Sequence, residues 1–242
     1  MQIPKKIHYC WFGNNEKPEI VKKCIESWKK YMPDYEIIEW NESNYDCHKS
    51  KYVNQAYTCK KWAFVSDYVR FDVINKYGGI YMDTDVELLK PIPKEILNNK
   101  AFTAMEPLGN VSPGLIFAAI PNFKFTKKIL DIYNKTEFIK DNKPICKTVN
   151  SFATELLISN GFKKIDEYQV IDDLVIYPSN YFCSFDLDVH EVSITNDSVS
   201  VHHYAGSWKK NGLKSKFQKI IKKIFGIKIY RKLLVIKRRI RG

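Results

Sequence analysis

The chain lacks several features that would assign it to a class of protein at once. Its six cysteines form no C-x-x-C pair and no zinc-like spacing, which favours free thiols in a reducing compartment over a zinc site. It contains no run of 18 apolar residues, so we expect no transmembrane helix. Its opening residues are too mixed in character for an export signal, and we therefore expect a cytoplasmic protein.

Acidic residues are absent from the end of the chain, after Asp197. Of the 39 Lys and Arg residues, 12 fall within residues 214–242, whereas all 27 Asp and Glu residues precede that segment. The formal net charge of +12 therefore belongs to this tail, and residues 1–213 are balanced. The high isoelectric point gives no support to nucleic-acid binding by the main part of the chain, and we expect no nucleic-acid partner.

The tail has the pattern of a basic amphipathic helix. Apolar residues recur at positions i, i+3, i+4, i+7 and i+8 from Phe217, lysines fall on the other side, and a second such pattern follows Gly226. Helices of this kind lie on anionic membrane surfaces, although a helix packed on the domain with a solvated basic face has the same pattern. We expect a main domain at 1–213, and a tail at 214–242 that holds the protein on the inner face of the plasma membrane.

Strand and helix patterns alternate over the first 120 residues, which predicts an α/β fold in the main domain. Gly78 is expected to cap the long helix that precedes the central strand. The expected strands cover residues 5–12, 35–40, 101–105, 114–120, 174–177 and 198–204, with another directly after Gly78, and the expected helices cover residues 19–30, 54–77, 123–133 and 150–160.

The most informative segment is GGIYMDTDVE, at residues 78–87. Asp83 and Asp85 stand one residue apart at the end of an apolar run. On a strand they would project to the same side, because strand side chains alternate with a period of two. Ligand sites in open α/β sheets lie at the carboxyl ends of strands. Two hard carboxylates there suit Mg²⁺ or Mn²⁺ held together with a substrate diphosphate.

The D-x-D belongs to a series of four blocks that together resemble glycosyltransferase family 32, the DXD sugar-binding region family. The four blocks are spread over residues 3–209, so the resemblance covers most of the main domain. The blocks are IPKKIHYCWFG at residues 3–13, MPDYEIIEW at 32–40, A-x-x-S-D-x-x-R at 63–70 leading into YGGIYMDTDVEL, and VHHYAGSWK at 201–209. The family includes fungal α-mannosyltransferases and is distantly similar to clostridial glucosylating toxins.

This resemblance implies a GT-A fold, a Rossmann-like sheet that binds a nucleotide-sugar with a divalent metal on the diphosphate. It implies Asp85 as the first metal ligand, Asp83 at the ribose or in the water shell of the metal, and a late histidine as a further ligand. His203 fits the spacing of that histidine better than His202 does, and the choice between them stays open. The metal, Mn²⁺ or Mg²⁺, would neutralise charge on the leaving nucleoside diphosphate.

The resemblance also implies a donor-binding site. Asp67 and Arg70 are three residues apart on one helix face and would hold hydroxyls of the donor sugar, while Trp11 would lie against the nucleobase. Ser207 and Trp208 would hydrogen-bond the phosphates and close a loop over the donor. The remaining donor-binding residues that the motif implies are Gly79, Tyr81 and Asp83.

We expect a retaining transferase of bacterial surface polysaccharide synthesis, which moves a sugar from a nucleotide-sugar, a UDP-sugar in the first instance, to a glycan acceptor on a lipid carrier. Its catalytic residues would be Asp67, Arg70, Asp83 and Asp85. Two other classes stay open. A phosphatase of the haloacid dehalogenase type would use Asp83 as its nucleophile and the pair 172–173 as its late acidic residues. A basic module would bind membranes or nucleic acid through the tail.

Overall fold

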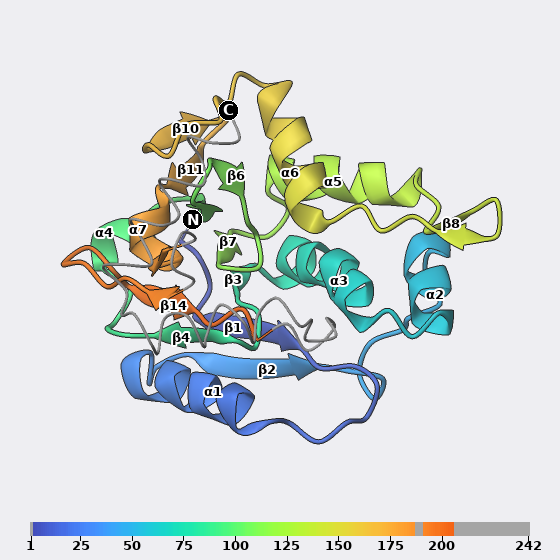
Figure 1. Cartoon of the computed structure of the whole chain (residues 1–242), viewed down its shortest axis with the longest axis horizontal. Coiled ribbons are helices and arrows are strands. Elements are labelled where there is room, and N and C mark those ends of the chain that lie inside the picture. The colour runs from blue at the N-terminus through green and yellow to red at the C-terminus, as the bar shows by residue number, and fades with distance from the viewer. Residues whose placement is uncertain (1, 187–190, 206–242) are drawn as a thin grey trace, which may run out of the picture.

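A mixed β-sheet forms the centre of the computed structural model, which describes residues 2–186 and 191–205 (Figure 1). The strand order is β10-β11-β5-β7-β3-β1-β2, and β6 pairs with β5. The strands are β1 (Lys6–Cys10), β2 (Glu36–Trp40), β3 (Gly79–Tyr81), β5 (Ala101–Glu106), β6 (Asn110–Val111), β7 (Phe117–Ala119), β10 (Gln169–Ile171) and β11 (Leu174–Tyr177).

Three small two-stranded sheets and seven helices complete the described part of the chain. The small sheets pair β4 (Val86–Leu88) with β14 (Ser200–His202), β8 (Ile139–Lys140) with β9 (Lys143–Pro144), and β12 (Phe185–Asp186) with β13 (Glu191–Val192). The helices are α1 (Glu19–Tyr31), α2 (Lys51–Thr58), α3 (Trp62–Tyr77), α4 (Lys94–Leu97), α5 (Lys124–Asn134), α6 (Val149–Ile158) and α7 (Ser179–Phe182).

The direction of the strands decides which loops meet. β1 is parallel to β2 and to β3, whereas β7 runs antiparallel to both β3 and β5. It follows that β3 and β5 are parallel to each other, and β11 is parallel to β5. The carboxyl ends of β1, β2, β3, β5 and β11 therefore share one edge of the sheet, which is the edge where α/β proteins bind ligands.

The sheet separates two hydrophobic cores (Figure 1). Helices α2, α3, α5 and α6 cover one face, and α1, α4, α7 and the β4–β14 pair cover the other. Strand residues alternate between the two cores with the expected period of two: Leu174 and Ile176 of β11 face the first core, and Val175 and Tyr177 face the second. Because both faces are covered, the two strands at the centre of the sheet, β3 and β7, are apolar throughout.

The predicted α/β class and most of the predicted elements are confirmed, but one long helix is not. The segment 54–77 is divided into α2 and α3 by a turn at Cys59–Lys61. The turn has Lys60 in the left-handed region (φ 55°) and a hydrogen bond from the Lys61 N–H to the Ala56 carbonyl, which closes a helix in the way a glycine usually does. Gly78 ends α3 as predicted, with φ 64° and its N–H bonded to Ile74.

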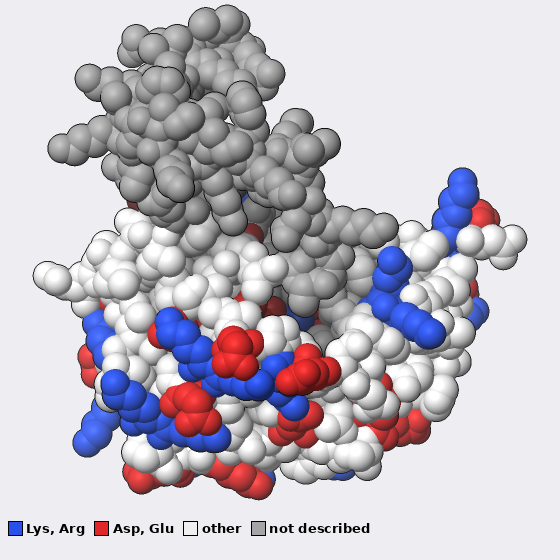
Figure 2. Space-filling view, turned by 60° about the horizontal axis from the view of Figure 1, so that its bottom comes forward, with Lys and Arg blue, Asp and Glu red and all other residues white. Residues whose placement is uncertain are grey.

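Charges are mixed over the surface formed by α1 and its neighbours (Figure 2). Lys22 and Lys29 pair with glutamates three residues before them on α1, and Lys23 reaches across to Glu87 of β4. This mixture agrees with the balanced composition of residues 1–213. The tail at 214–242 lies outside the described residues, and in the part that the structure describes no helix is long and apolar enough to cross a membrane.

Candidate active site

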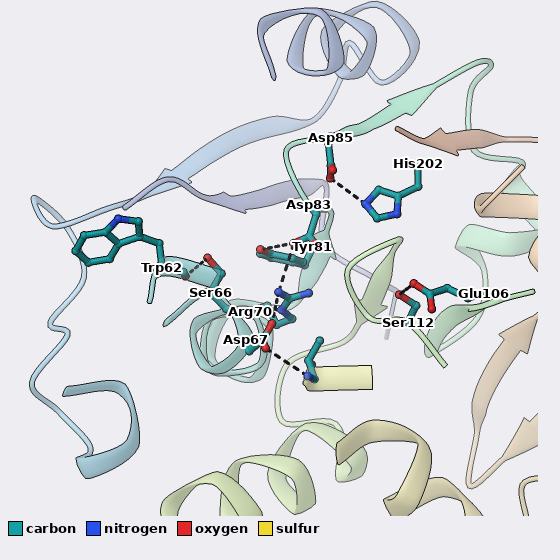
Figure 3. Close-up of polar contacts among 11 residues, drawn as sticks. Trp62, Ser66, Asp67, Arg70, Tyr81, Asp83, Asp85, Glu106, Ser112 and His202 are labelled. Carbon is teal, nitrogen blue, oxygen red and sulfur yellow. Dashed lines mark hydrogen bonds and ion pairs between the residues drawn. The ribbon is translucent and has the colours of Figure 1, made fainter. Parts of the chain in front are cut away.

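The D-x-D occupies a turn between β3 and β4, not a strand. β3 ends at Tyr81, and the Val86 N–H donates to the Asp83 carbonyl at 3.0 Å to close a four-residue turn. The prediction that strand alternation places both aspartates on one side is therefore wrong in its premise. The turn instead directs Asp83 and Asp85 to different partners at the carboxyl edge of the sheet (Figure 3).

Asp85 is held by the last described segment of the chain. Its Oδ1 lies 2.9 Å from Nε2 of His202, its Oδ2 accepts the Ala205 N–H at 3.0 Å, and its carbonyl accepts the His203 N–H at 3.0 Å. Although burial opposes the charged form, the hydrogen bond from His202 lowers the pKa of Asp85 below its ordinary value. The same contact, against the effect of burial, raises the pKa of His202. The two groups therefore form a charge-assisted pair.

His202, not His203, is the histidine beside Asp85 (Figure 3). The ring of His203 points to Glu87, with Nε2 2.7 Å from Oε2. His202 is the last residue of β14 and pairs with Val86, the first residue of β4. Asp85 lies in the turn directly before Val86, and its carboxylate reaches the ring of His202 from there. The structure therefore places His202 beside Asp85, not the His203 that the spacing favoured, and the ligand role of either histidine stays a prediction.

Asp83 joins a second cluster, built mainly on α3 (Figure 3). Arg70 Nη2 lies 2.7 Å from Oδ1 of Asp67 and 3.4 Å from Oδ1 of Asp83, and the Tyr81 hydroxyl donates to the same Asp83 oxygen at 3.0 Å. The Val149 N–H, in the first turn of α6, donates to the other oxygen of Asp67. The structure therefore brings four of the predicted residues, Asp67, Arg70, Tyr81 and Asp83, into one polar cluster.

Burial sets the protonation of this cluster. Asp67 and Arg70 are 6% and 3% exposed. Burial raises the pKa of Asp67 to about 7, and Asp83 adds to the effect while Arg70 and the Val149 N–H oppose it. Burial opposes the charge of Arg70, but its neighbours, with Asp83 first among them and Asp67 contributing, together outweigh burial and raise the pKa of Arg70 above the ordinary value, so that Arg70 stays charged. Its Nη1 is buried without a hydrogen-bond partner, so the guanidinium can still donate to an anionic ligand.

Gly114 is a site residue that the sequence did not indicate. Its carbonyl accepts the Asp83 N–H at 2.9 Å, and a Cβ at this position would come within 2.1 Å of Asp83 Oδ2 and 3.0 Å of Arg70 Nη1. The predicted strand at 114–120 is shorter than expected, and β7 begins only at Phe117. Only a glycine lets this loop approach the aspartate so closely.

The other predicted residues lie in three different places. Trp11 follows β1 at the carboxyl edge, is partly exposed, and donates from its indole N–H to the Asn15 carbonyl at 2.7 Å. Gly79 stands at the opposite end of β3, buried against β1, where a Cβ would lie 2.7 Å from the Lys6 carbonyl; the structure does not bring it to the D-x-D. Ser207 and Trp208 lie outside the described residues.

Asp85 and His202 offer a donor set that suits a divalent cation. Carboxylate oxygen together with an imidazole nitrogen is a combination that Mn²⁺ accepts, and His202 has a buried Nδ1 without a hydrogen-bond partner. Among the described residues, no group of three or more His, Cys, Asp or Glu side chains is arranged to hold a metal ion. The chemistry of the pair therefore fits the predicted metal, and its role as ligand stays a prediction.

The arrangement of the chain argues against the phosphatase hypothesis. Asp172 and Asp173 precede β11, whose first residue pairs with Ala101 at the amino end of β5. They therefore lie at the edge of the sheet opposite to Asp83, where they form ion pairs with lysines. They cannot serve as the late acidic pair of a site centred on the D-x-D.

Residues 18–103 match the family model described as the glycosyltransferase sugar-binding region containing the DXD motif. This match confirms the resemblance that the motifs carry: residues 18–103 are similar to the DXD sugar-binding region of glycosyltransferases. The matched segment runs from α1 to β5, and it contains Asp67, Arg70, Asp83 and Asp85.

Named relatives include enzymes of two kinds. Inositol phosphoceramide mannosyltransferases 3 and 1 of Schizosaccharomyces pombe are 34% identical over 96 residues and 27% identical over 150 residues, covering 35% and 57% of this chain. Human alpha-1,4-N-acetylglucosaminyltransferase is 33% identical over 99 residues, covering 40% of this chain. The alignments span 24%, 44% and 24% of these relatives, so the chain corresponds to less than half of each.

Proposed function

We propose that the chain is a metal-dependent glycosyltransferase of the GT-A type that takes its sugar from a nucleotide-sugar donor. The observation that carries this proposal is the pairing of Asp85 with His202 beside the Asp67–Arg70–Asp83 cluster, at the carboxyl edge of the sheet. All of these residues except His202 lie within the family segment. A carboxylate–imidazole pair next to a buried guanidinium supports the binding of a diphosphate with its divalent cation.

Each group in the site has a role that follows from its chemistry. Asp85 and His202 would hold Mn²⁺ or Mg²⁺, and Arg70 would donate from its unpartnered Nη1 to a diphosphate oxygen or to the sugar. When bound, the cation neutralises the charge that grows on the leaving nucleoside diphosphate. Trp11 offers a flat aromatic face at the end of β1, on the side of the site where we place the nucleobase.

Nucleoside-diphosphate release tests the proposal directly. The wild-type chain and Asp85→Asn are incubated with UDP-glucose, UDP-galactose, UDP-N-acetylglucosamine and GDP-mannose, each with Mn²⁺, with Mg²⁺ and with EDTA. We expect slow hydrolysis of one donor that needs the metal and that Asp85→Asn abolishes. Absence of release and of metal-dependent binding for every donor would remove the basis of the proposal.

We further propose that transfer retains the anomeric configuration, with the leaving phosphate taking the proton of the acceptor in a front-face displacement. The anomeric linkage of the product, determined by NMR, tests this step. An inverted linkage from an α-linked donor would contradict it.

The acceptor is proposed to be a glycan on a lipid carrier in bacterial surface polysaccharide synthesis, on the cytoplasmic side of the membrane. Two of the relatives are named for transfer to a lipid, inositol phosphoceramide, and the 12 basic residues of segment 214–242 suit an anionic membrane surface. We expect the full chain to sediment with liposomes that contain anionic lipid and a 1–213 variant to remain in solution. Equal sedimentation of both would contradict the membrane role of the tail.

A further inference from the structure

Glu106 is a carboxylate at the carboxyl edge that neither the sequence motifs nor the proposed roles account for. It is the last residue of β5, and β5 is parallel to β3 and to β1. Its carboxyl end therefore lies at the same edge as Trp11, which follows β1, and as the D-x-D, which follows β3. Because the order across the sheet is β1-β3-β7-β5, Glu106 and Trp11 lie on opposite sides of the D-x-D.

Two hydroxyl groups lie beside the side chain of Glu106. Ser112 donates to its Oε1 at 3.3 Å, and the hydroxyl of Tyr204 is close enough to interact with the carboxylate. Both hydroxyls are themselves fixed: the Ser112 N–H donates to the Ala104 carbonyl at 2.9 Å, and the Tyr204 oxygen lies 3.2 Å from the Cys183 sulfur. A carboxylate has about four acceptor positions, so Glu106 keeps capacity for a ligand, and it is partly exposed.

The chain makes a strained turn directly after Glu106. The Gly109 N–H donates to the Glu106 carbonyl at 3.1 Å, and the turn places Leu108 at φ 86° with 77% of its surface exposed. A leucine rarely adopts this conformation, and such outliers gather at ligand sites. The turn is held by Gly109, whose missing Cβ would lie 2.7 Å from the backbone of Lys164.

We infer that Glu106 binds the transferred sugar, accepting a hydrogen bond from one of its hydroxyls, and so determines which donor sugar the site takes. The inference rests on the proposed function. A nucleotide-sugar with its base at Trp11 and its diphosphate at the D-x-D extends its sugar toward β5, where Figure 3 shows Glu106 and Ser112 on the side of Asp83 away from Trp62. A carboxylate only accepts hydrogen bonds, and a sugar hydroxyl can donate one.

The consequence is discrimination between sugars. A site built to bond one hydroxyl rejects an analogue that lacks it, because the buried polar groups of the site are then left unpaired. Ser112 supports this role, since its hydroxyl orients the carboxylate. Glu106 is thus a specificity-determining residue that contacts substrate, separate from the Asp85–His202 pair.

A comparison of the affinity for nucleoside diphosphates with the affinity for nucleotide-sugars shows whether Glu106 contacts the sugar or acts on the metal and diphosphate part of the site. Glu106→Gln and wild type are titrated calorimetrically, in MnCl₂, with UDP, GDP, UDP-glucose, UDP-galactose, UDP-N-acetylglucosamine and GDP-mannose. We expect Glu106→Gln to weaken binding of the preferred nucleotide-sugar about ten- to one-hundred-fold, as for loss of a hydrogen bond to a charged group, with unchanged affinity for the nucleoside diphosphate. Glu26→Gln, at an exposed residue of α1 that forms an ion pair with Lys29, is the matched control and should equal wild type.

Donors that lack one sugar hydroxyl at a time identify the group that Glu106 binds. One of these deoxy donors should bind the wild-type chain as weakly as the intact donor binds Glu106→Gln. The same deoxy donor should bind Glu106→Gln with no further loss of affinity, because in a double-mutant cycle two changes that remove the same interaction are not additive. An equal loss for the nucleoside diphosphate and the nucleotide-sugar would overturn the inference, because Glu106 would then act through Tyr204 and His202. Unchanged affinity for both would overturn it as well. A wild-type chain that binds no nucleotide-sugar would instead overturn the proposed function, and the inference with it.

Discussion

At the scale of single residues, Gly114 is the glycine with the least room for a side chain, because its backbone lies against Asp83. In Gly114→Ala the new Cβ would lie 2.1 Å from Asp83 Oδ2, so the carboxylate must move. A displacement of about 1 Å at a reacting centre costs about one hundred-fold in rate, and we expect a loss of this order in nucleoside-diphosphate release, with a folded chain by circular dichroism.

Gly161→Ala provides the matched comparison for Gly114→Ala. Gly161 has φ 97°, and a Cβ there would meet nothing within 4 Å. The change should lower the free energy of unfolding by about 1 kcal/mol through backbone strain and leave donor release unchanged. Normal donor release by Gly114→Ala would show that Asp83 tolerates displacement, contrary to the role given to it.

The two neighbouring histidines should differ in their effect on metal binding. His202 contacts Asp85, whereas His203 contacts Glu87. We expect His202→Ala to weaken Mn²⁺ binding in the presence of UDP by more than about tenfold, since loss of even an outer-shell partner costs that much. His203→Ala should leave the affinity unchanged. Electron paramagnetic resonance of free Mn²⁺ measures the affinity of both variants. A larger loss of affinity in His203→Ala than in His202→Ala would favour His203 as the metal ligand, as the motif spacing suggested.

This pair also shows what local sequence could and could not predict about the site. The D-x-D, Asp67 and Arg70 were identified because their motifs are contiguous. His202 was not preferred, because the choice depends on how β14 pairs with β4, and 116 residues separate His202 from Val86, its partner in that register. Glu106 and Gly114 gave no signal, since each is defined by a loop approaching another from elsewhere in the chain.

At the scale of elements, α3 carries a buried ion pair and α1 carries an exposed one of the same spacing. The side chains of Arg70 and Asp67 are 3% and 9% exposed, whereas those of Lys29 and Glu26 are 57% and 68% exposed. Arg70→Ala leaves Asp67 and Asp83 without their counter-charge, and we expect it to lower the free energy of unfolding by about 3–5 kcal/mol.

Urea denaturation of Arg70→Ala and Lys29→Ala tests this difference. The exposed pair is screened by water and should contribute less than about 0.5 kcal/mol. Similar losses in the two variants would mean that Arg70 is retained for ligand binding alone and does not stabilise α3. A large effect of Lys29→Ala would mean that the exposed ion pair of α1 is not screened by water.

Helix and strand patterns predicted most elements within a few residues, and the failures have a common cause. The break between α2 and α3 uses Lys60 in a left-handed conformation, and the D-x-D sits in a turn without glycine or proline. Neither segment contains the glycine or proline that most strongly marks a turn, although Asp83 and Asp85 are themselves turn-forming residues. Each turn is closed by a backbone hydrogen bond, from the Lys61 N–H to the Ala56 carbonyl and from the Val86 N–H to the Asp83 carbonyl, which helix and strand periodicity does not predict.

At the scale of the whole molecule, His8 connects three parts of the fold in the interior of the sheet. Its Nε2–H donates to the Gly78 carbonyl at 2.9 Å, and the Trp40 indole N–H donates to its Nδ1 at 3.1 Å. The ring must therefore be neutral in the folded state. Burial lowers the pKa of His8 to about 4; Lys6 adds to this shift, while the bond to Gly78 and the charge of Glu36 oppose it.

The unfolded chain thus binds a proton at His8 more readily than the folded chain does. Stability is complete above the ordinary pKa of 6.5 and is lost as the pH falls from there toward 4, by about 3 kcal/mol in total. Because carboxylates also titrate in this range, the difference between wild type and His8→Gln isolates the effect. In urea unfolding at pH values from 7.5 to 4.5, we expect a flatter profile for His8→Gln, and His48→Gln, at an exposed histidine, should follow wild type. Parallel profiles for wild type and His8→Gln would mean that the acid sensitivity of the fold arises elsewhere.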